Sequence, residues 1–422
     1  MNKIKLGVIR EGKVPPDFRV PLTPKQCKLV KQKFSNIEVI VQSSQIRAFS
    51  DELYLNEGIT VQEDMSDCDV LIGVKEVQIK DLIPNKKYLF FSHTIKKQPY
   101  NRNLLRAVLD KKIQLIDYEV LKNRIGKRLI GFGRYAGIVG CYNGFRAFGI
   151  KHNLYELTPA NQCHDRVEME NELKKVILPA STKIVLTGFG RVGYGAREIM
   201  DLLPIIEVSP EEFISQKFAE AVFTHLEVDD YFARKDGAIF DKKDFYANPE
   251  NYKSIFPKFA KESDIYVACH FWSNLSPIII SREDFKQNSR LKVVADVSCD
   301  IDGPVACTLI PTTITNPFFG YNPTTEKEDD FMKTENVMVM SVDNLPCELP
   351  KDASEDFGNE LIKHILPAMF MEDPDNIIGR GSETNLNGEL TEYFKYLEEY
   401  VHNSVEINVS LESLIPPISK VE

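Results

Sequence analysis

The sequence predicts an α/β protein with two Rossmann-like domains, each built on a parallel sheet, and a cofactor cleft between them. Three observations support this prediction. Short apolar strands alternate with helical segments in the first third of the chain, which is the pattern of βαβ units. A later apolar strand leads into a glycine-rich turn and then a helix, as in dinucleotide-binding folds. The chain has 422 residues, more than a single hydrophobic core usually supports.

The first domain is expected to begin at residue 1 and to run to about 135. Strands are predicted within 3–11, 37–44, 69–75, 88–93 and 113–119, where short β-branched or aromatic runs are bounded by polar residues. Helices are predicted within 22–34 and 101–111. Thr23 followed by Pro24 has the composition of a helix N-cap and first turn.

The second domain, residues 136–344, is predicted to bind a dinucleotide. A glycine-bearing helical stretch at 135–154 suits close helix packing and a connection between domains. The strand at 183–187 then enters Gly188-x-Gly190-x-x-Gly193, with Arg191 and Val192 at the start of the next helix. The first glycine permits a tight turn, the second lets the backbone approach a pyrophosphate, and the third allows the helix to pack closely on the strand.

The acid that binds the ribose is expected on the next strand, about 20 residues further on. Residues 204–213 are interpreted as that strand, with Glu207 inside it and Ser209 at its tip. A carboxylate at the tip favours NAD, whereas a small residue leaves room for the extra phosphate of NADP. The choice between NAD and NADP therefore stays open. His270, close to the only tryptophan, is expected either to line the cofactor cleft or to belong to a packed aromatic cluster.

The remaining elements complete both domains. Strands at 221–228, 263–272, 291–298 and 337–343 extend the second sheet, and an insertion is predicted near 235–260. An amphipathic helix within 344–370 is expected to return to the first domain, and a last helix is predicted at 389–401. The first domain is thus discontinuous, comprising residues 1–135 and about 345–422.

Composition excludes several classes of protein. The net charge of −10 argues against a nucleic-acid-binding surface. No apolar run is long enough for a membrane helix, and the N-terminus lacks a secretory signal, so a cytoplasmic protein is expected. Eight cysteines without C-x-x-C spacing and seven histidines without an H-x-x-x-H pair predict reduced thiols and no metal site.

Eight stretches together resemble one known family. They are REGKVPPDFRVPLTP, LIGVKE, YLFFSHTIKKQ, QLIDYE, YAGIVG, GFGRVGYGA, VVADVSCDIDG and SVDNLPCELPKDAS, in this order along nearly the whole chain. The chain resembles the saccharopine dehydrogenase and lysine–ketoglutarate reductase family, which is related to alanine dehydrogenase and transhydrogenase. The insertion and the stretch TTITNPFFGYNP are more similar to the ketoglutarate reductase branch than to alanine dehydrogenase.

The resemblance implies a catalytic pair, Lys75 and His93. Both follow apolar strands, and parallel strands carry active residues at their carboxyl ends. The implied reaction is hydride transfer between a nicotinamide and the secondary amine carbon of saccharopine, after which the imine is hydrated and collapses to lysine and 2-oxoglutarate, or the reverse. Lys75 would act as a base if cations such as His93, Lys96 or Arg19 lower its pKa. His93 would carry the second proton, because imidazole exchanges protons near neutral pH.

The resemblance also implies a substrate site. Saccharopine has three carboxylates, so several cations are expected around it, and Arg19 offers a two-pronged contact for one of them. Asp343 matches a family residue near the nicotinamide. Arg134 lies in a stretch where relatives differ. The substrate-binding candidates are Arg19, Lys96, Glu76, Glu119, Arg128 and Arg134.

Two alternative functions remain open. An alanine dehydrogenase-like enzyme would aminate pyruvate and would need one carboxylate anchor. A non-catalytic dinucleotide-binding subunit would need neither Lys75 nor His93. The expected partners are small molecules (saccharopine, lysine and 2-oxoglutarate), and a homodimer is a hypothesis for the assembly. The sequence does not determine the physiological direction.

Overall fold

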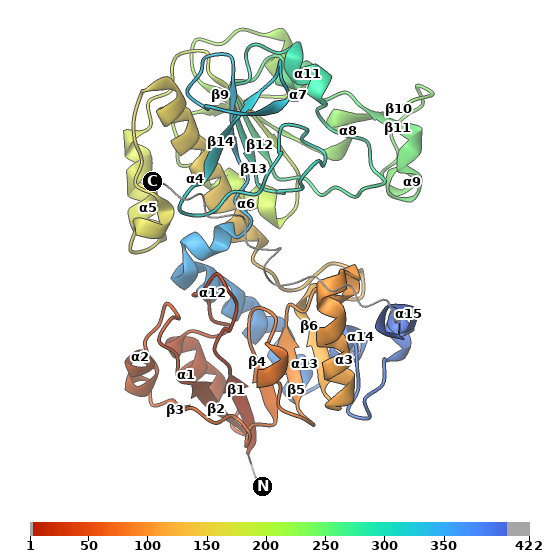
Figure 1. Ribbon diagram of the computed structural model, residues 1–422. Helices are drawn as coiled ribbons and strands as arrows, with labels where there is room; N and C mark the ends of the chain where they lie inside the picture. Colours follow the sequence, from red (N-terminus) through yellow and green to blue (C-terminus); the bar gives the residue numbers. More distant parts are fainter. Residues whose placement is uncertain (1–2, 403–422) are drawn as a thin grey trace, which may run out of the picture. The chain divides into compact units, whose positions relative to one another are not determined.

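The computed structural model describes residues 3–402, whose backbone forms two compact units. Residues up to Gly131 and from Ser354 onward make up the first unit, and Phe132–Ala353 make up the second (Figure 1). Residues 1–2 and 403–422, which belong to the predicted first domain, lie outside the described residues. No helix within 3–402 is long and apolar enough to cross a membrane.

The first unit is built on a six-stranded sheet in which every neighbouring pair is parallel. The order is β3-β2-β1-β4-β5-β6 (Figure 1). The five strands predicted in this region are confirmed, and β3 is an addition. The strands are β1 (Ile4–Val8), β2 (Ile37–Gln42), β3 (Thr60–Gln62), β4 (Val70–Ile72), β5 (Lys87–Phe90) and β6 (Gln114–Asp117).

Helices from both ends of the chain complete this unit. The helix at Thr23 begins as predicted, because Thr23 forms a capping box with Gln26 and Pro24 occupies the first turn. The segment 389–401 differs from the prediction of one helix, since a 3₁₀ turn over Glu392–Leu397 precedes a short α-helix. The α-helices are α1 (Pro24–Lys33), α2 (Asp51–Asn56), α3 (Arg102–Asp110), α12 (Pro350–Glu360), α13 (Leu366–Phe370), α14 (Ile377–Gly381) and α15 (Glu398–His402), with a π-helical turn at Leu361–Ile365.

The second unit contains an eight-stranded sheet in the order β15-β14-β16-β13-β12-β7-β9-β8. Six strands are parallel, and β14 and β15 form an antiparallel edge that was not predicted. The predicted α/β class with parallel sheets is confirmed. The strands are β7 (Lys183–Thr187), β8 (Ile206–Glu207), β9 (Val222–Leu226), β12 (Ile265–Ala268), β13 (Val293–Asp296), β14 (Phe318–Asn322), β15 (Lys327–Asp329) and β16 (Val337–Met340), with a separate hairpin of β10 (Phe232–Arg234) and β11 (Tyr252–Ser254).

Helices pack on this sheet, and two of them touch backbone to backbone. The helices are α4 (Gly133–His152), α5 (Arg166–Glu172), α6 (Arg191–Met200), α7 (Pro210–Ser215), α8 (Val228–Tyr231), α9 (Lys242–Ala247), α10 (Pro257–Ala260) and α11 (Arg282–Lys286). A Cβ added at Gly137 of α4 would lie 1.8 Å from the carbonyl oxygen of Val192 in α6, and one at Gly195 would lie 2.0 Å from that of Arg134. The close helix packing predicted from the glycines of 135–154 is therefore confirmed.

Replacing Gly137 by alanine is expected to lower the free energy of unfolding by about 1–3 kcal/mol, because the new methyl group forces α4 and α6 apart. Urea unfolding measures the change. Gly190→Ala is the matched control, since a Cβ there would meet nothing within 4 Å. Wild-type stability of Gly137→Ala would show that the two helices do not need this close contact.

Candidate active site

The carboxyl edge of the first sheet gathers the predicted catalytic pair. Lys75 and Glu76 follow β4, and His93 follows the neighbouring strand β5. The Nδ1–H of His93 donates to Oε1 of Glu76, since a carboxylate only accepts. Burial opposes ionisation of Glu76, but the hydrogen bond and charge of His93 outweigh it and lower the pKa of Glu76 to about 2. Glu76 thus stays a carboxylate that orients the imidazole.

A hydrogen bond fixes the backbone of Lys75, and its surroundings lower the pKa of its side chain. Glu11, which follows β1 and is 8% exposed, accepts the backbone N–H groups of Val74 at 2.7 Å and Lys75 at 2.8 Å. Burial and then the charges of Arg19 and Lys13 lower the pKa of Lys75, against Asp17 and Glu76. Arg19 acts as predicted, whereas the second cation is Lys13 rather than His93 or Lys96. Burial raises the pKa of Glu11 itself to about 8.

The loop that carries His93 rests on two buried carboxyl groups. His93 has a φ of 55°, which is rare for a residue other than glycine and needs support from its surroundings. On either side of it, the Ser92 hydroxyl donates to Asp117 and the Thr94 hydroxyl donates to Glu383. Asp117 and Glu383 are both fully buried at 0% exposure, and burial followed by their mutual proximity raises the pKa of Glu383 well above its usual value. Neither residue was predicted.

Glu383 reaches this position through backbone pairing. Its N–H donates to the carbonyl of Leu115 in β6 at 2.8 Å, and Ser382 forms a bridge with Ile116. The carboxyl group therefore comes from a segment 291 positions away from Ser92. No local pattern around Glu383 indicates this role, because the contact exists only after the C-terminal segment has joined the sheet.

Three further substrate-binding candidates, Lys96, Glu119 and Arg128, lie in the first unit. Lys96 and Glu119 contact each other, with Nζ 3.5 Å from Oε1. The guanidinium of Arg128 lies 5.4 Å from the ring centre of Phe91, and that ring stacks on His93 at 6.5 Å. The structure therefore brings Arg128 into the surroundings of His93.

The other two predicted anchors are engaged by carboxylates of the chain. Arg19 is 3% exposed and donates two hydrogen bonds to Asp17, from Nη2 to Oδ2 at 2.6 Å and from Nε to Oδ1 at 3.0 Å. Arg134 lies in the second unit, at the start of α4, and grips Glu198 with Nε–Oε1 at 2.6 Å. Arg134 therefore belongs to the second unit rather than to the predicted first domain, and its role as a substrate anchor stays a prediction.

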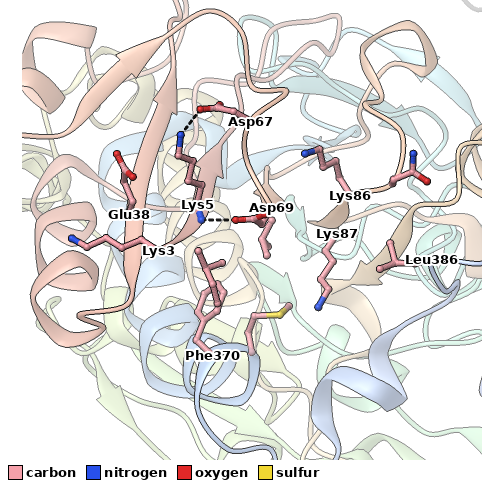
Figure 2. Close-up of a pocket in the computed structure, with 13 residues that line it drawn as sticks. Lys3, Lys5, Glu38, Asp67, Asp69, Lys86, Lys87, Phe370 and Leu386 are labelled. Carbon is pink, nitrogen blue, oxygen red and sulfur yellow. Dashed lines mark hydrogen bonds and ion pairs between the residues drawn. The ribbon is translucent and has the colours of Figure 1, made fainter. Parts of the chain in front are cut away.

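A cavity of about 930 Å³ lies at the opposite, amino edge of the first sheet. It is lined by the beginnings of β1, β4 and β5 and by Phe370. Figure 2 shows the Lys5 ammonium group paired with Asp67 beside it, while the Lys5 backbone N–H donates to Asp69. Among the described residues around this cavity, none is a predicted site residue. Its size therefore does not mark it as the active site.

The second unit contains a nucleotide-sized pocket over the glycine-rich turn. Gly188 has a φ of +99°, and a Cβ there would lie 2.4 Å from the carbonyl oxygen of Cys269. A Cβ at Gly193 would lie 1.7 Å from the carbonyl of Gly188, while Gly190 faces open space. The three predicted glycine roles fit this geometry, and Arg191 begins α6 behind the turn. The pocket of about 390 Å³ is lined by Gly188, Phe189, Gly190, Val192, Glu227, Val228, Tyr231, Lys242, Tyr246, Cys269, His270 and Phe271.

The acid of this pocket is Glu227, which corrects the interpretation of 204–213. The strand beside β7 is β9, with Thr187 paired to Leu226, and Glu227 follows directly. Glu207 ends the outer strand β8, where Arg197 donates to it at 2.7 Å and lowers its pKa. Ser209 caps α7 rather than ending a strand. The reason is topological, because residues 201–221 insert an edge strand and a helix before the strand that carries the acid.

Two histidines support the pocket. His225 of β9 donates from Nε2 to the carbonyl of Gly188 at 2.7 Å, and its ring stacks on Phe189 at 3.8 Å. Nothing in the sequence singled out His225. His270 lines the pocket, and its Nδ1 lies 3.1 Å from the Thr187 hydroxyl and 3.3 Å from the Tyr266 hydroxyl. Burial lowers the pKa of His270 to about 3.

Asp343, the last predicted cofactor-binding residue, lies outside the pocket over the glycine-rich turn. It follows β16, the third strand from β7 in the sheet, and its side chain is exposed. It shares the carboxyl edge of that sheet, yet it does not line the described pocket. Its predicted proximity to the nicotinamide stays a prediction.

The parallel sheets and the glycine-rich turn define a Rossmann-type α/β protein, and solved structures share its fold. An L-alanine dehydrogenase superposes with a TM-score of 0.62 at 17% identity, covering 94% of this chain and 100% of that one. A transhydrogenase from Sinorhizobium meliloti gives 0.57 at 13% identity, covering 92% and 98%. At these identities the similarity shows the fold alone.

Sequence comparisons give the family. Residues 7–139 match the alanine dehydrogenase/PNT N-terminal domain. Similar proteins are the alpha-aminoadipic semialdehyde synthase of Arabidopsis thaliana (30% identity, 93% of this chain, 41% of that protein) and its mitochondrial counterpart from Mus musculus (28%, 94%, 48%). Another is the NAD(+), L-lysine-forming saccharopine dehydrogenase of Yarrowia lipolytica (26%, 86%, 92%). These similarities bear out the resemblance to the saccharopine dehydrogenase and lysine–ketoglutarate reductase family, and the matched domain is one that alanine dehydrogenase and transhydrogenase share. It spans less than half the length of the synthases.

Replacing Glu383 by glutamine is expected to stabilise the protein more at about pH 8 than at about pH 5. The folded chain raises the pKa of Glu383, whereas an unfolded glutamate titrates near pH 4. Above that pH the folded state binds more protons than the unfolded state, so stability falls as pH rises. Glutamine removes this titration and keeps a hydrogen-bonding group.

Thermal unfolding midpoints at the two pH values measure the effect. Glu392→Gln is the control on the same segment, since its side chain is 81% exposed. An equal midpoint shift at both pH values would contradict the assignment of a protonated, buried Glu383.

Proposed function

We propose that this chain is a nicotinamide-dependent oxidoreductase acting on a CH–NH group, specifically a saccharopine dehydrogenase of the lysine-forming type. The observation that carries the proposal is the half-buried Lys75 beside the His93–Glu76 pair at one sheet edge. The glycine cradle of the second unit supports it, and so does the 26% sequence identity over 92% of the length of the Yarrowia lipolytica enzyme. The cytoplasmic location stays a prediction.

Lys75 is suited to accept a proton from the substrate amine. Burial and the charges of Arg19 and Lys13 favour its neutral form, and Glu11 fixes its backbone. A nicotinamide dinucleotide whose pyrophosphate is held at the glycine cradle would supply or accept the hydride.

His93 is suited to move a second proton. Its Nδ1 is engaged by Glu76, so the opposite ring nitrogen is the one that exchanges protons with water or substrate. The low pKa of Glu76 keeps a carboxylate beside the ring as the acceptor of the Nδ1–H.

Cations near His93 would bind the carboxylates of the substrate. Arg128 lies over Phe91, and Lys96 is loosely paired with Glu119. Arg19 is buried with Asp17, so its role in the proposal is to tune Lys75. Arg128→Glu separates the two enzyme hypotheses, because a substrate with three carboxylates depends on more anchors than pyruvate does.

A reductive assay tests the function. Purified protein is mixed with lysine and 2-oxoglutarate, and the loss of absorbance of NADH or NADPH is followed in parallel. Oxidation that requires both lysine and 2-oxoglutarate supports the proposal. Oxidation with pyruvate and ammonia alone would replace it by the alanine dehydrogenase alternative.

Lys75→Met and His93→Gln are each expected to lower kcat by about 10²- to 10⁴-fold, the usual contribution of one general acid or base. Dinucleotide affinity is expected to stay unchanged, because the pocket belongs to the second unit. The control is Lys97→Gln, which removes an exposed cation on the same loop. Wild-type turnover by Lys75→Met or His93→Gln would refute the proposed role of that residue.

We further propose a preference for NAD, because Glu227 stands where a carboxylate binds the ribose hydroxyls and repels a 2′-phosphate. Glu227→Gln keeps an acceptor for the cap of α8 and removes the charge. The ratio of kcat/KM for NADH over NADPH is expected to fall about tenfold, as for loss of one charged contact. Glu207→Gln should leave the ratio unchanged, and the reverse result would restore the interpretation of 204–213.

A further inference from the structure

The insertion near 235–260 supplies part of the pocket wall. It consists of the β10–β11 hairpin and α9. Lys242 and Tyr246 of α9 line the same pocket as the Gly188–Gly190 turn. They are four residues apart, so one face of the helix presents both side chains.

A small aromatic core holds this helix in place. Phe232, Phe245 and Tyr252 are buried, with Phe245 ring centres 4.9 Å from Phe232 and 5.1 Å from Tyr252. The Tyr252 hydroxyl donates to Asp244 of α9 at 2.8 Å. These rings belong to the same hydrophobic cluster as Val222 of β9. The insertion is therefore packed on the nucleotide-binding sheet and forms a fixed wall.

The charge of the wall is suited to an anion. Of the described residues around the pocket, Lys242 is the only lysine or arginine. Within residues 3–402 its ammonium group has no carboxylate within ion-pair distance, unlike Arg234 of the same insertion, which pairs with Asp236 and Asp244. His270 contributes no positive charge at neutral pH.

The pocket also exposes aromatic rings. Tyr246 is 56% exposed, Phe271 is 78% exposed and Phe189 is 37% exposed, and all three line the pocket. Exposed rings beside a phosphate-binding turn are typical of sites that stack a nucleotide base.

We propose that the insertion is a nucleotide-binding arm, in which Lys242 pairs with a phosphate of the dinucleotide and Tyr246 stacks on its adenine. This inference rests on the proposed use of a dinucleotide and assigns its adenosine half to residues outside the glycine turn. The phosphate is either part of the pyrophosphate or the 2′-phosphate of NADP. A contact with the pyrophosphate predicts equal use of Lys242 by NADH and NADPH, whereas a contact with the 2′-phosphate predicts that only NADPH depends on Lys242.

Titration calorimetry of the full chain with NADH, NADPH and ADP-ribose tests the arm. Lys242→Gln is expected to weaken binding about tenfold, the usual effect of losing one charged hydrogen bond. Tyr246→Leu is expected to weaken all three ligands by a similar factor. Lys243→Gln is the matched control, because Lys243 is adjacent and exposed but does not line the pocket.

Equal weakening of NADH and NADPH by Lys242→Gln would assign the pyrophosphate, and weakening of NADPH alone would assign the 2′-phosphate. Both results support the arm. Wild-type affinity of Lys242→Gln and Tyr246→Leu for every ligand would overturn it and leave the proposed function intact. If the arm variants bind dinucleotide more weakly but the wild-type protein does not turn over lysine and 2-oxoglutarate, the proposed reaction alone is overturned. No dinucleotide binding by the wild-type protein would overturn both.

Discussion

The parallel pairing of the strands is the constraint on which both sites depend. Parallel strands end at one edge, so residues that follow successive strands are brought together however far apart they lie in the chain. In the first unit this edge joins Glu11, Lys75 and His93 from β1, β4 and β5. In the second unit it joins Gly188, Glu227 and His270 from β7, β9 and β12. Each set would disperse if a single strand changed its place in the order.

A strained backbone and buried carboxyl groups also lie at this edge of the first sheet. His93 has a left-handed backbone, and the carboxyl groups that hold its neighbours are buried where ionisation is costly. The hydrogen bonds from Ser92 and Thr94 satisfy these carboxyls only in this loop geometry. A buried polar network of this kind specifies one conformation, because any alternative leaves its members unpaired. The loop is therefore fixed by groups that never need to touch a substrate.

Local patterns were sufficient to predict most strands, the helix at Thr23 and the three glycine roles, since these depend on periodicity and backbone conformation. Lys75 and His93 were paired through the family resemblance, and the visible strand ends in the sequence were consistent with that pairing. Strand order is not visible in the sequence, so Glu207 was predicted and Glu227 was not considered. Glu383 could not be found from the sequence either, because its partners are Ser92 and Thr94 in a distant segment. The boundary before Arg134 was not found either, because the first unit ends at Gly131 and not at the predicted residue 135.

The charged groups of the first unit follow one further rule. Arg19 pairs with Asp17, Lys96 with Glu119, and His93 with Glu76, so each predicted cation of these pairs is already matched by a carboxylate of the chain. Removing one partner of a buried pair such as Arg19–Asp17 would strongly lower the stability of the protein. Such a pair is therefore poorly suited to exchange Asp17 for a carboxylate of a ligand. Lys96 is 48% exposed and its contact is 3.5 Å long, so exchanging Glu119 for a substrate carboxylate costs little there. Burial thus divides the cations by role: Arg19 sets the electrostatic surroundings of Lys75, and the exposed Lys96 is the cation suited to bind a carboxylate that arrives from solution.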